Sequence, residues 1–200
     1  MAGAPAGTPP PSRIMIIRHA EKPPDPPNKS GPWDVQINGQ SGGGKSLIVP
    51  GWQRAGALNN FFAPYKSKPA DPKIVTPHHI YAANPRGETQ RPWETVMPLA
   101  AWLGYREGTA KFDVSYSIGD EKHLVKSVLE HSSPVLICWE HDHIMPGMIG
   151  HINDQYKITN YASIPNPFPN VFYLVWVLEL DGGKYTWSSV NQNLMAGDVS

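Results

Sequence analysis

The sequence predicts an α/β protein, a three-layer α/β/α sandwich with a mostly parallel sheet. Short apolar runs without alternation, which are typical of buried parallel strands, take turns along the chain with stretches of helical periodicity. A hairpin is expected near the C-terminus, because two strand-like runs flank the turn residues Asp181-Gly182-Gly183. Such an order favours a parallel sheet that is covered by helices on both faces.

Each element is supported by its own pattern. Buried strands are expected where the apolar runs are short, at residues 13–18, 79–82 and 134–139, and the hairpin strands at 171–180 and 185–190. Apolar positions three and four residues apart predict helices at 51–62, 91–103, 120–130 and 144–152. Pro98 lies within the second of these helices and is expected to bend or shorten it.

Composition limits the classes of function. Lys and Arg together number 17 and Asp and Glu together 17, so the formal net charge of zero argues against nucleic acid as a partner. The 18 glycines and 22 prolines predict long, stiff loops. We expect a mobile tail over residues 1–12, one domain over 13–200, and a lid-like loop over 23–50.

The expected location follows from what the chain lacks. The longest apolar run covers residues 171–178, far short of the ~20 residues that a membrane helix needs. The first twelve residues have neither the basic start nor the apolar stretch of a signal peptide. Cys138 is the single cysteine, so an internal disulfide is impossible. We therefore expect a cytoplasmic protein without a membrane partner.

Basic and imidazole side chains follow the predicted strands. Arg18 and His19 end the first run, Arg91 follows the second at the start of a helix, and His141 follows the third. Ligands of parallel sheets bind outside the carboxyl ends of the strands, so these side chains are expected to converge. Arginine binds phosphate through two parallel hydrogen bonds, and histidine serves as a nucleophile near neutral pH. The pattern predicts an anion pocket in which the two imidazoles face each other.

These residues carry a resemblance to a known family. Arg18-His19-Ala20-Glu21 after an apolar strand resembles the R-H-G-E signature of the histidine phosphatase superfamily, the phosphoglycerate-mutase-like proteins. Further segments are similar to the family's pattern in the same order: Ser46-Leu47 with Gly51-Trp52-Gln53-Arg54-Ala55, Arg91 with Thr95, and His141. The resemblance covers roughly residues 13–152. The chain departs from it at the second histidine, where Glu140-His141-Asp142 replaces G-H-G.

The resemblance implies a phosphoglycerate-mutase-like fold and hydrolysis of a small-molecule phosphomonoester. His19 would carry the phosphoryl group, and Arg18, Arg91 and His141 would bind its oxygens, with neither a metal nor an organic cofactor. The proton donor is left open between a carboxylate before the third helix, Glu121 or Asp120, and Asp142. Arg86 competes with Arg91 as a phosphate ligand, and mutase activity is a weaker expectation than hydrolysis.

Two alternatives remain. Residues 39–46 match G-x-x-x-x-G-K-S, the phosphate-binding P-loop of nucleotide enzymes. A P-loop has to follow a buried strand and open a helix, whereas here a half-polar stretch precedes it and Pro50-Gly51 follows. The second alternative is a protein of the same fold that binds a phosphorylated ligand without catalysis.

Overall fold

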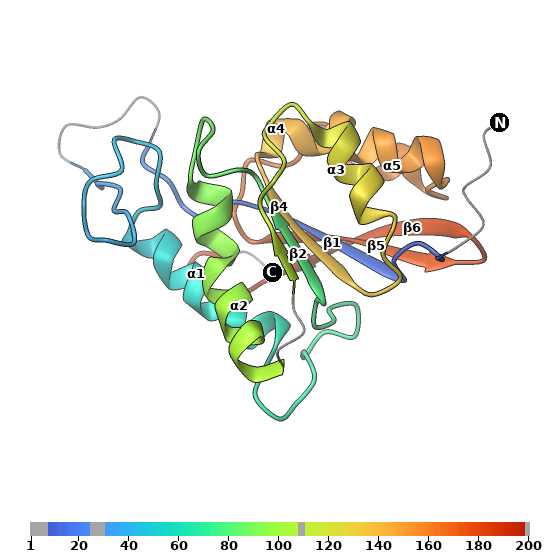
Figure 1. Ribbon diagram of the computed structural model, residues 1–200, viewed down its shortest axis with the longest axis horizontal. Helices are drawn as coiled ribbons and strands as arrows, with labels where there is room; N and C mark the ends of the chain where they lie inside the picture. Colours follow the sequence, from blue (N-terminus) through green and yellow to red (C-terminus); the bar gives the residue numbers. More distant parts are fainter. Residues whose placement is uncertain (1–7, 25–30, 108–110, 199–200) are drawn as a thin grey trace.

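Six strands form one mixed sheet in the computed structural model, which describes residues 8–24, 31–107 and 111–198 (Figure 1). The strands are β1 (Arg13–Arg18), β2 (His79–Ala82), β3 (Lys111–Asp113), β4 (Val135–Trp139), β5 (Leu174–Asp181) and β6 (Lys184–Asn191). They lie in the order β3-β2-β4-β1-β5-β6. The first four pair in parallel, and β5 joins β1 antiparallel and forms a hairpin with β6.

Strand β1 lies in the interior of the sheet, between β4 and β5, and both neighbours pair with almost its whole length. Arg18 is in register with Trp139 of β4, so the residues that follow β1 and β4 leave the sheet side by side. Buried strands of this kind are apolar on both faces, and β1 and β4 are buried along nearly all of their length. This pairing is the feature of the fold that brings the two predicted histidines to one edge.

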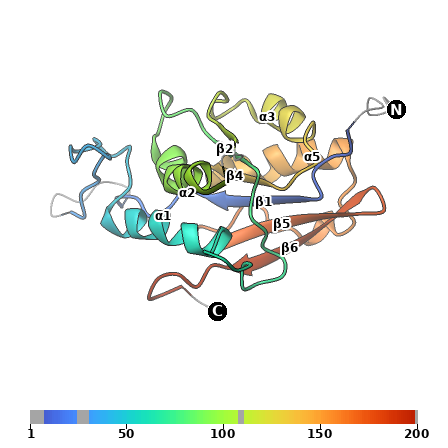
Figure 2. The same ribbon diagram turned by 60° about the horizontal axis from the view of Figure 1, so that its bottom comes forward.

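Helices cover both faces of the sheet. α1 (Val49–Phe62) and α2 (Arg91–Glu107) pack on one face, and α3 (Glu121–Val128) and α5 (Ile149–Gln155) on the other (Figures 1 and 2). Two apolar clusters fill the spaces between the layers, with Leu58 and Leu99 in one and Val125 and Ile149 in the other. The predicted three-layer sandwich is therefore confirmed.

The structure departs from the predicted elements at three places. Strand β3 was not predicted, because Lys-Phe-Asp at the edge of the sheet has no apolar run. α2 continues to Glu107 with Pro98 inside it. The predicted helix 144–152 instead starts at His141 and is broken at Met145, whose backbone is extended, into α4 (His141–His143), a wide turn η1 (Ile144–Met148) and α5.

The tail and the lid can be followed only in part. Residues 1–7 of the predicted tail and 25–30 of the predicted lid lie outside the described residues. Ser12 hydrogen bonds to Ser132 and Leu180 through its backbone, so the end of the predicted tail joins the sheet. The domain boundaries and the lid role of residues 23–50 stay predictions.

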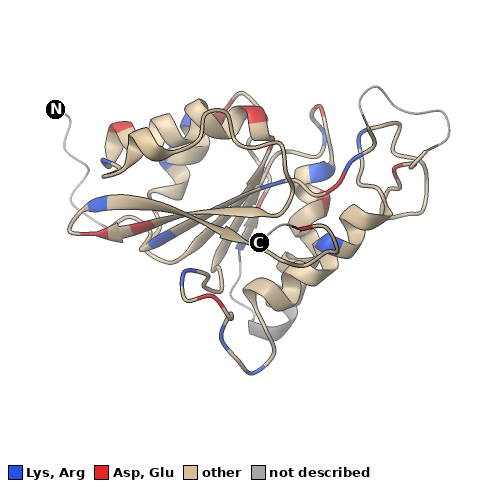
Figure 3. Ribbon diagram, turned by 180° about the vertical axis from the view of Figure 1, so that it is seen from behind, with Lys and Arg blue, Asp and Glu red and all other residues tan. Residues whose placement is uncertain are grey.

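The placement of charged and apolar residues in the described chain agrees with the balanced charge and the short apolar runs of the sequence. Figure 3 shows basic and acidic residues at both ends of the molecule, without separation by sign. Among the described helices none combines the length and the apolarity that a membrane span requires.

Cys138 lies within β4, where burial raises the pKa of its thiol well above the usual value, so it stays an unreactive core residue.

Two stacked histidines predict how stability depends on pH. The rings of His79 and His131 stack with centroids 3.6 Å apart, and burial together with the charge of His131 lowers the pKa of His79 to about 4. A folded-state pKa below the unfolded value means that stability is lost as the pH falls from about 6.5 towards 4. We expect the pair to contribute about 1 kcal/mol to this loss, since partial exposure screens it. Urea unfolding of the wild type and His79→Gln at pH 7.5 and 4.5 measures it, and an identical loss in both proteins would contradict the assignment.

Candidate active site

His19 directly follows β1 and is fully buried. Its backbone amide donates to the Trp139 carbonyl, and the next amide, that of Ala20, donates to Thr95 Oγ1 over 2.8 Å. Thr95 in turn donates to the carbonyl of Arg91 one helical turn earlier. The end of β1 is thus tied to β4 and to the first turns of α2, which places three segments of the predicted motif together.

The imidazole of His19 has a defined tautomer. Nδ1 lies 2.7 Å from the Ala20 carbonyl oxygen, which only accepts, so Nδ1 carries the proton and Nε2 keeps its lone pair. Burial lowers the pKa of His19 below its usual value, and the neighbouring Glu140 offsets this only in part. The ring is therefore neutral at pH 7, with a free electron pair on the nitrogen that faces the other site residues.

Arg18 lies beside this ring. One of its terminal nitrogens donates to Asn170 Oδ1 over 2.5 Å, and its guanidinium carbon lies 4.4 Å from the centroid of the Phe172 ring. Burial lowers the pKa of Arg18, whereas the negative charges of Glu140 and Asp142 raise it. The charge of Arg18 is thus close to both carboxylates.

Arg91, at the start of α2, is held by the described part of the lid. Its Nη2 donates to the Gly44 carbonyl over 2.5 Å, and the Lys45 carbonyl accepts from the hydroxyl of Thr89. Glu94 accepts from the Leu47 amide over 2.9 Å, and burial raises the pKa of this carboxyl. The structure therefore brings Arg91 to the site, whereas the competing Arg86 is exposed and bonds through its backbone to Asn84.

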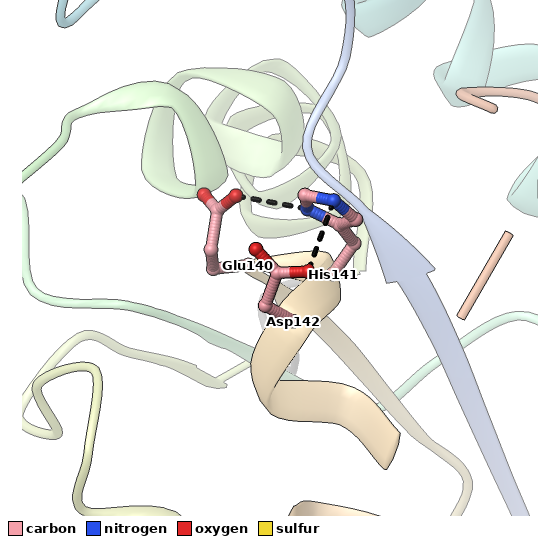
Figure 4. Close-up of side chains that lie close together, drawn as sticks. All are labelled: Glu140, His141 and Asp142. Atoms are coloured by element: carbon pink, nitrogen blue, oxygen red, sulfur yellow. Dashed lines mark hydrogen bonds and ion pairs between the residues drawn. The ribbon is translucent and has the colours of Figure 1, made fainter. Parts of the chain in front are cut away.

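His141 lies between two carboxylates at the start of α4, as Figure 4 shows. Its Nδ1 is 3.0 Å from Glu140 Oε1, and its Nε2 is 3.2 Å from Asp142 Oδ1. The ligand atoms of these three residues lie within 4.8 Å of one another, which is close enough for a metal ion. The adjacent guanidinium of Arg18 opposes a cation there.

Glu140 connects the two imidazoles. Its second oxygen, Oε2, lies 3.3 Å from His19 Nε2, so each carboxylate oxygen contacts one histidine. Burial raises the pKa of Glu140, but the two neighbouring imidazoles, His141 through a hydrogen bond and His19 through its proximity, outweigh this and hold the pKa at about 2. His19 and His141 are therefore both neighbours of one carboxylate, and their facing each other across an anion pocket stays a prediction.

Glu121 has a different environment from Asp142. It is buried, and its Oε1 accepts from Trp139 Nε1 and from the Gly119 amide, both over 2.9 Å. His143 Nδ1 lies 3.1 Å from the same oxygen. Asp142, by contrast, has a side chain that is 69% exposed.

A cavity of about 320 Å³ adjoins these side chains. Its lining consists of Glu88, Thr89, Arg91, Ile118, Glu140, Asp142 and His143. Asp142 and Arg91 therefore face the cavity directly, whereas Glu121 reaches it only through His143. His19 lies behind Glu140, whose carboxylate contacts the imidazole and also lines the cavity.

Residues 39–46 do not have P-loop geometry. Only isolated bridges, and no strand, precede this loop within the described residues 31–38, and the next helix starts at Val49. The Ser46 amide, which a P-loop would direct at phosphate, instead donates to the buried carboxylate of Asp34 over 2.9 Å. A Cβ on Gly42 would lie 2.4 Å from Asp34 Oδ2, so this glycine permits close packing of the loop on itself.

Sequence reasoning missed three contributors to the site. Glu140 was visible only as a departure from the family's turn, and its contact with His19 depends on the side-chain direction. Asn170 and Phe172 come from a loop that follows Arg18 by more than 150 residues, and both contact the Arg18 guanidinium. Long-range contacts of this kind have no local signal.

Comparisons with known proteins bear on the fold. No protein-family model matches the sequence, and no curated protein matches it. Among solved structures, the chain is similar to the ecdysone phosphate phosphatase of Bombix mori in complex with tungstate. The TM-score is 0.52 at 12% sequence identity, and the alignment covers 94% of this chain and 95% of that one. The chain thus shares its fold with this phosphatase, which agrees with the predicted phosphoglycerate-mutase-like fold.

Proposed function

We propose that the protein hydrolyses a phosphomonoester through a phosphohistidine intermediate on His19. The observation that carries this proposal is the buried imidazole, whose Nδ1 is bound to a carbonyl so that Nε2 keeps its lone pair and faces Glu140, the residue that also contacts His141. A neutral imidazole with a free Nε2 is a competent nucleophile at neutral pH. Arg18, Arg91 and His141 supply the positive and hydrogen-bonding groups that a phosphoryl group needs.

The first step transfers the phosphoryl group to the protein. Nε2 of His19 uses its lone pair to form the N–P bond, and the P–O bond to the alcohol breaks with its electron pair on oxygen. Arg18, Arg91 and His141 would stabilise the equatorial oxygens as charge builds up on them. The leaving oxygen takes a proton from a carboxylic acid in the cavity.

Asp142 fits the role of that acid better than Glu121. It lines the cavity, its carboxylate contacts His141 and not a set of structural donors, and its exposure lets it exchange protons with water. Glu121 already accepts from Trp139 and Gly119 and does not line the cavity. In the second step the Asp142 carboxylate takes a proton from water, which attacks phosphorus, breaks the N–P bond and restores His19.

The similar solved structure supports the binding of an oxyanion by a protein of this fold. The ecdysone phosphate phosphatase was solved with tungstate, a tetrahedral oxyanion. The rival function is binding of a phosphorylated ligand without turnover, and the carboxylate of Glu140 against His19 is the observation that favours it.

Trapping of the intermediate tests the proposal. The protein is mixed with a ³²P-labelled phosphomonoester, quenched in base within milliseconds and digested. We expect an acid-labile, base-stable label on the peptide that contains His19, and none in His19→Asn. Turnover without such a label would overturn the covalent mechanism, and phosphate binding with neither turnover nor label would support the rival function.

A further inference from the structure

The carboxylate of Glu140 lies where a phosphoryl group would have to bind. Its two oxygens contact His19 Nε2 at 3.3 Å and His141 Nδ1 at 3.0 Å. In-line attack by His19 requires phosphorus close to Nε2, at a reacting distance of about 3–3.5 Å. A substrate phosphorus and the Glu140 carboxylate therefore cannot occupy this place together.

The same carboxylate separates the nucleophile from solvent. His19 has no exposed surface, and the cavity next to it is lined by Glu140 and not by His19. The Glu140 side chain is 18% exposed and lines the cavity, which gives it space to turn outwards. A ligand that enters through the cavity reaches Nε2 only after this turn.

The contact with His19 is also one that a substrate can replace. With Nδ1 protonated by its bond to Ala20, Nε2 of the neutral ring presents a lone pair to a carboxylate that is ionised. Two acceptors facing each other do not form a hydrogen bond, so Glu140 is retained mainly by His141 and by the nearby charge of Arg18. These groups bind any anion at this position, whether it belongs to the chain or to a ligand.

We propose that Glu140 is an internal anion which fills the phosphoryl pocket of the free protein and competes with the substrate phosphate. This inference rests on the proposed function, because it assumes that the pocket accepts phosphate. It makes Glu140 a specificity-determining residue that weakens the binding of inorganic phosphate and so keeps the reaction product from occupying the site. Substrates bind when their remaining contacts in the cavity displace the carboxylate.

Binding of inorganic phosphate, measured by calorimetry, tests the proposal. Glu140→Ala removes the competing anion, and Glu140→Gln keeps the side-chain volume but removes the charge. We expect both variants to bind phosphate at least tenfold more tightly than the wild type. Glu88→Gln is the matched control, since it removes the same charge from the same cavity without a contact to either imidazole, and we expect a change below threefold.

The outcomes separate this inference from the proposed function. If the wild type forms the His19 adduct but Glu140→Gln and Glu140→Ala bind phosphate no more tightly, the competition is wrong and the proposed function stands. An equal gain in Glu88→Gln would also overturn it, because a general charge effect would then suffice. If no variant binds phosphate and no adduct forms, both proposals fail.

Discussion

Replacement of His19 by alanine is expected to lower kcat for an aryl phosphate by about a thousandfold or more. The imidazole forms the covalent bond to phosphorus in the proposed mechanism, and its Nε2 lies 3.3 Å from Glu140 Oε2 just after the end of β1. Turnover of the aryl phosphate at pH 7 by the purified variant measures the effect. Thermal unfolding of the same sample shows whether the fold is retained.

Lys45→Ala is the matched control for this experiment. Lys45 is exposed and would be the phosphate-binding lysine of a P-loop, but the structure places residues 39–46 in a loop closed on Asp34. We expect its turnover to stay within threefold of the wild type. If Lys45→Ala loses activity and His19→Ala retains it, the proposed phosphatase mechanism is wrong and a nucleotide enzyme is favoured.

Replacement of Arg54 by leucine is expected to lower the free energy of unfolding by about 3–5 kcal/mol. The Arg54 side chain is only 3% exposed and donates to both carboxylate oxygens of Glu21, to both of Asp198 and to Gln192. Burial alone lowers the pKa of Arg54, but the hydrogen bonds to Asp198 and Glu21 raise it above the usual value. Leucine would leave two enclosed carboxylates without their counter-charge.

Urea unfolding at pH 7 measures this loss, with Glu179→Gln as the control. Glu179 forms an ion pair with Arg13 at 2.5 Å, but its side chain is 54% exposed, and such surface pairs contribute about 0–1 kcal/mol. Because Arg54 holds the pKa of Asp198 below its usual value, the wild type loses this stabilisation as the pH falls, and the gap to Arg54→Leu narrows in acid. A loss no greater than that of Glu179→Gln would show that the cluster is not stabilising.

The cluster also explains a family motif that was predicted without a role. Arg54 lies in the segment Gly51–Ala55 that resembles the start of the family's first helix, and Glu21 ends the R-H-G-E-like segment. Their ion pair joins α1 to the residues that follow His19. We therefore expect the residues that follow His19 to be less well ordered in Arg54→Leu, in addition to the loss of stability.

Much of the fold could be predicted because buried parallel strands are apolar over their whole length. The runs at 13–18 and 79–82 match β1 and β2 at both ends. Helix ends were less certain, and the region after His141 was predicted as one helix because its apolar spacing is helical while its backbone breaks at Met145. The edge strand β3 was missed because its residues carry no such pattern.

The sequence by itself determined which chemical groups stand at the carboxyl ends of the strands, since these groups follow the apolar runs directly. Only the tertiary structure decided that β1 and β4 are neighbours, and hence that His19 and His141 contact one carboxylate. It also decided that this carboxylate belongs to Glu140, that Arg54 is enclosed by Glu21 and Asp198, and that residues 39–46 fold onto Asp34. The physical reason is that local patterns determine periodicity and burial, whereas side-chain direction and long-range charge pairing depend on contacts between segments far apart in the chain.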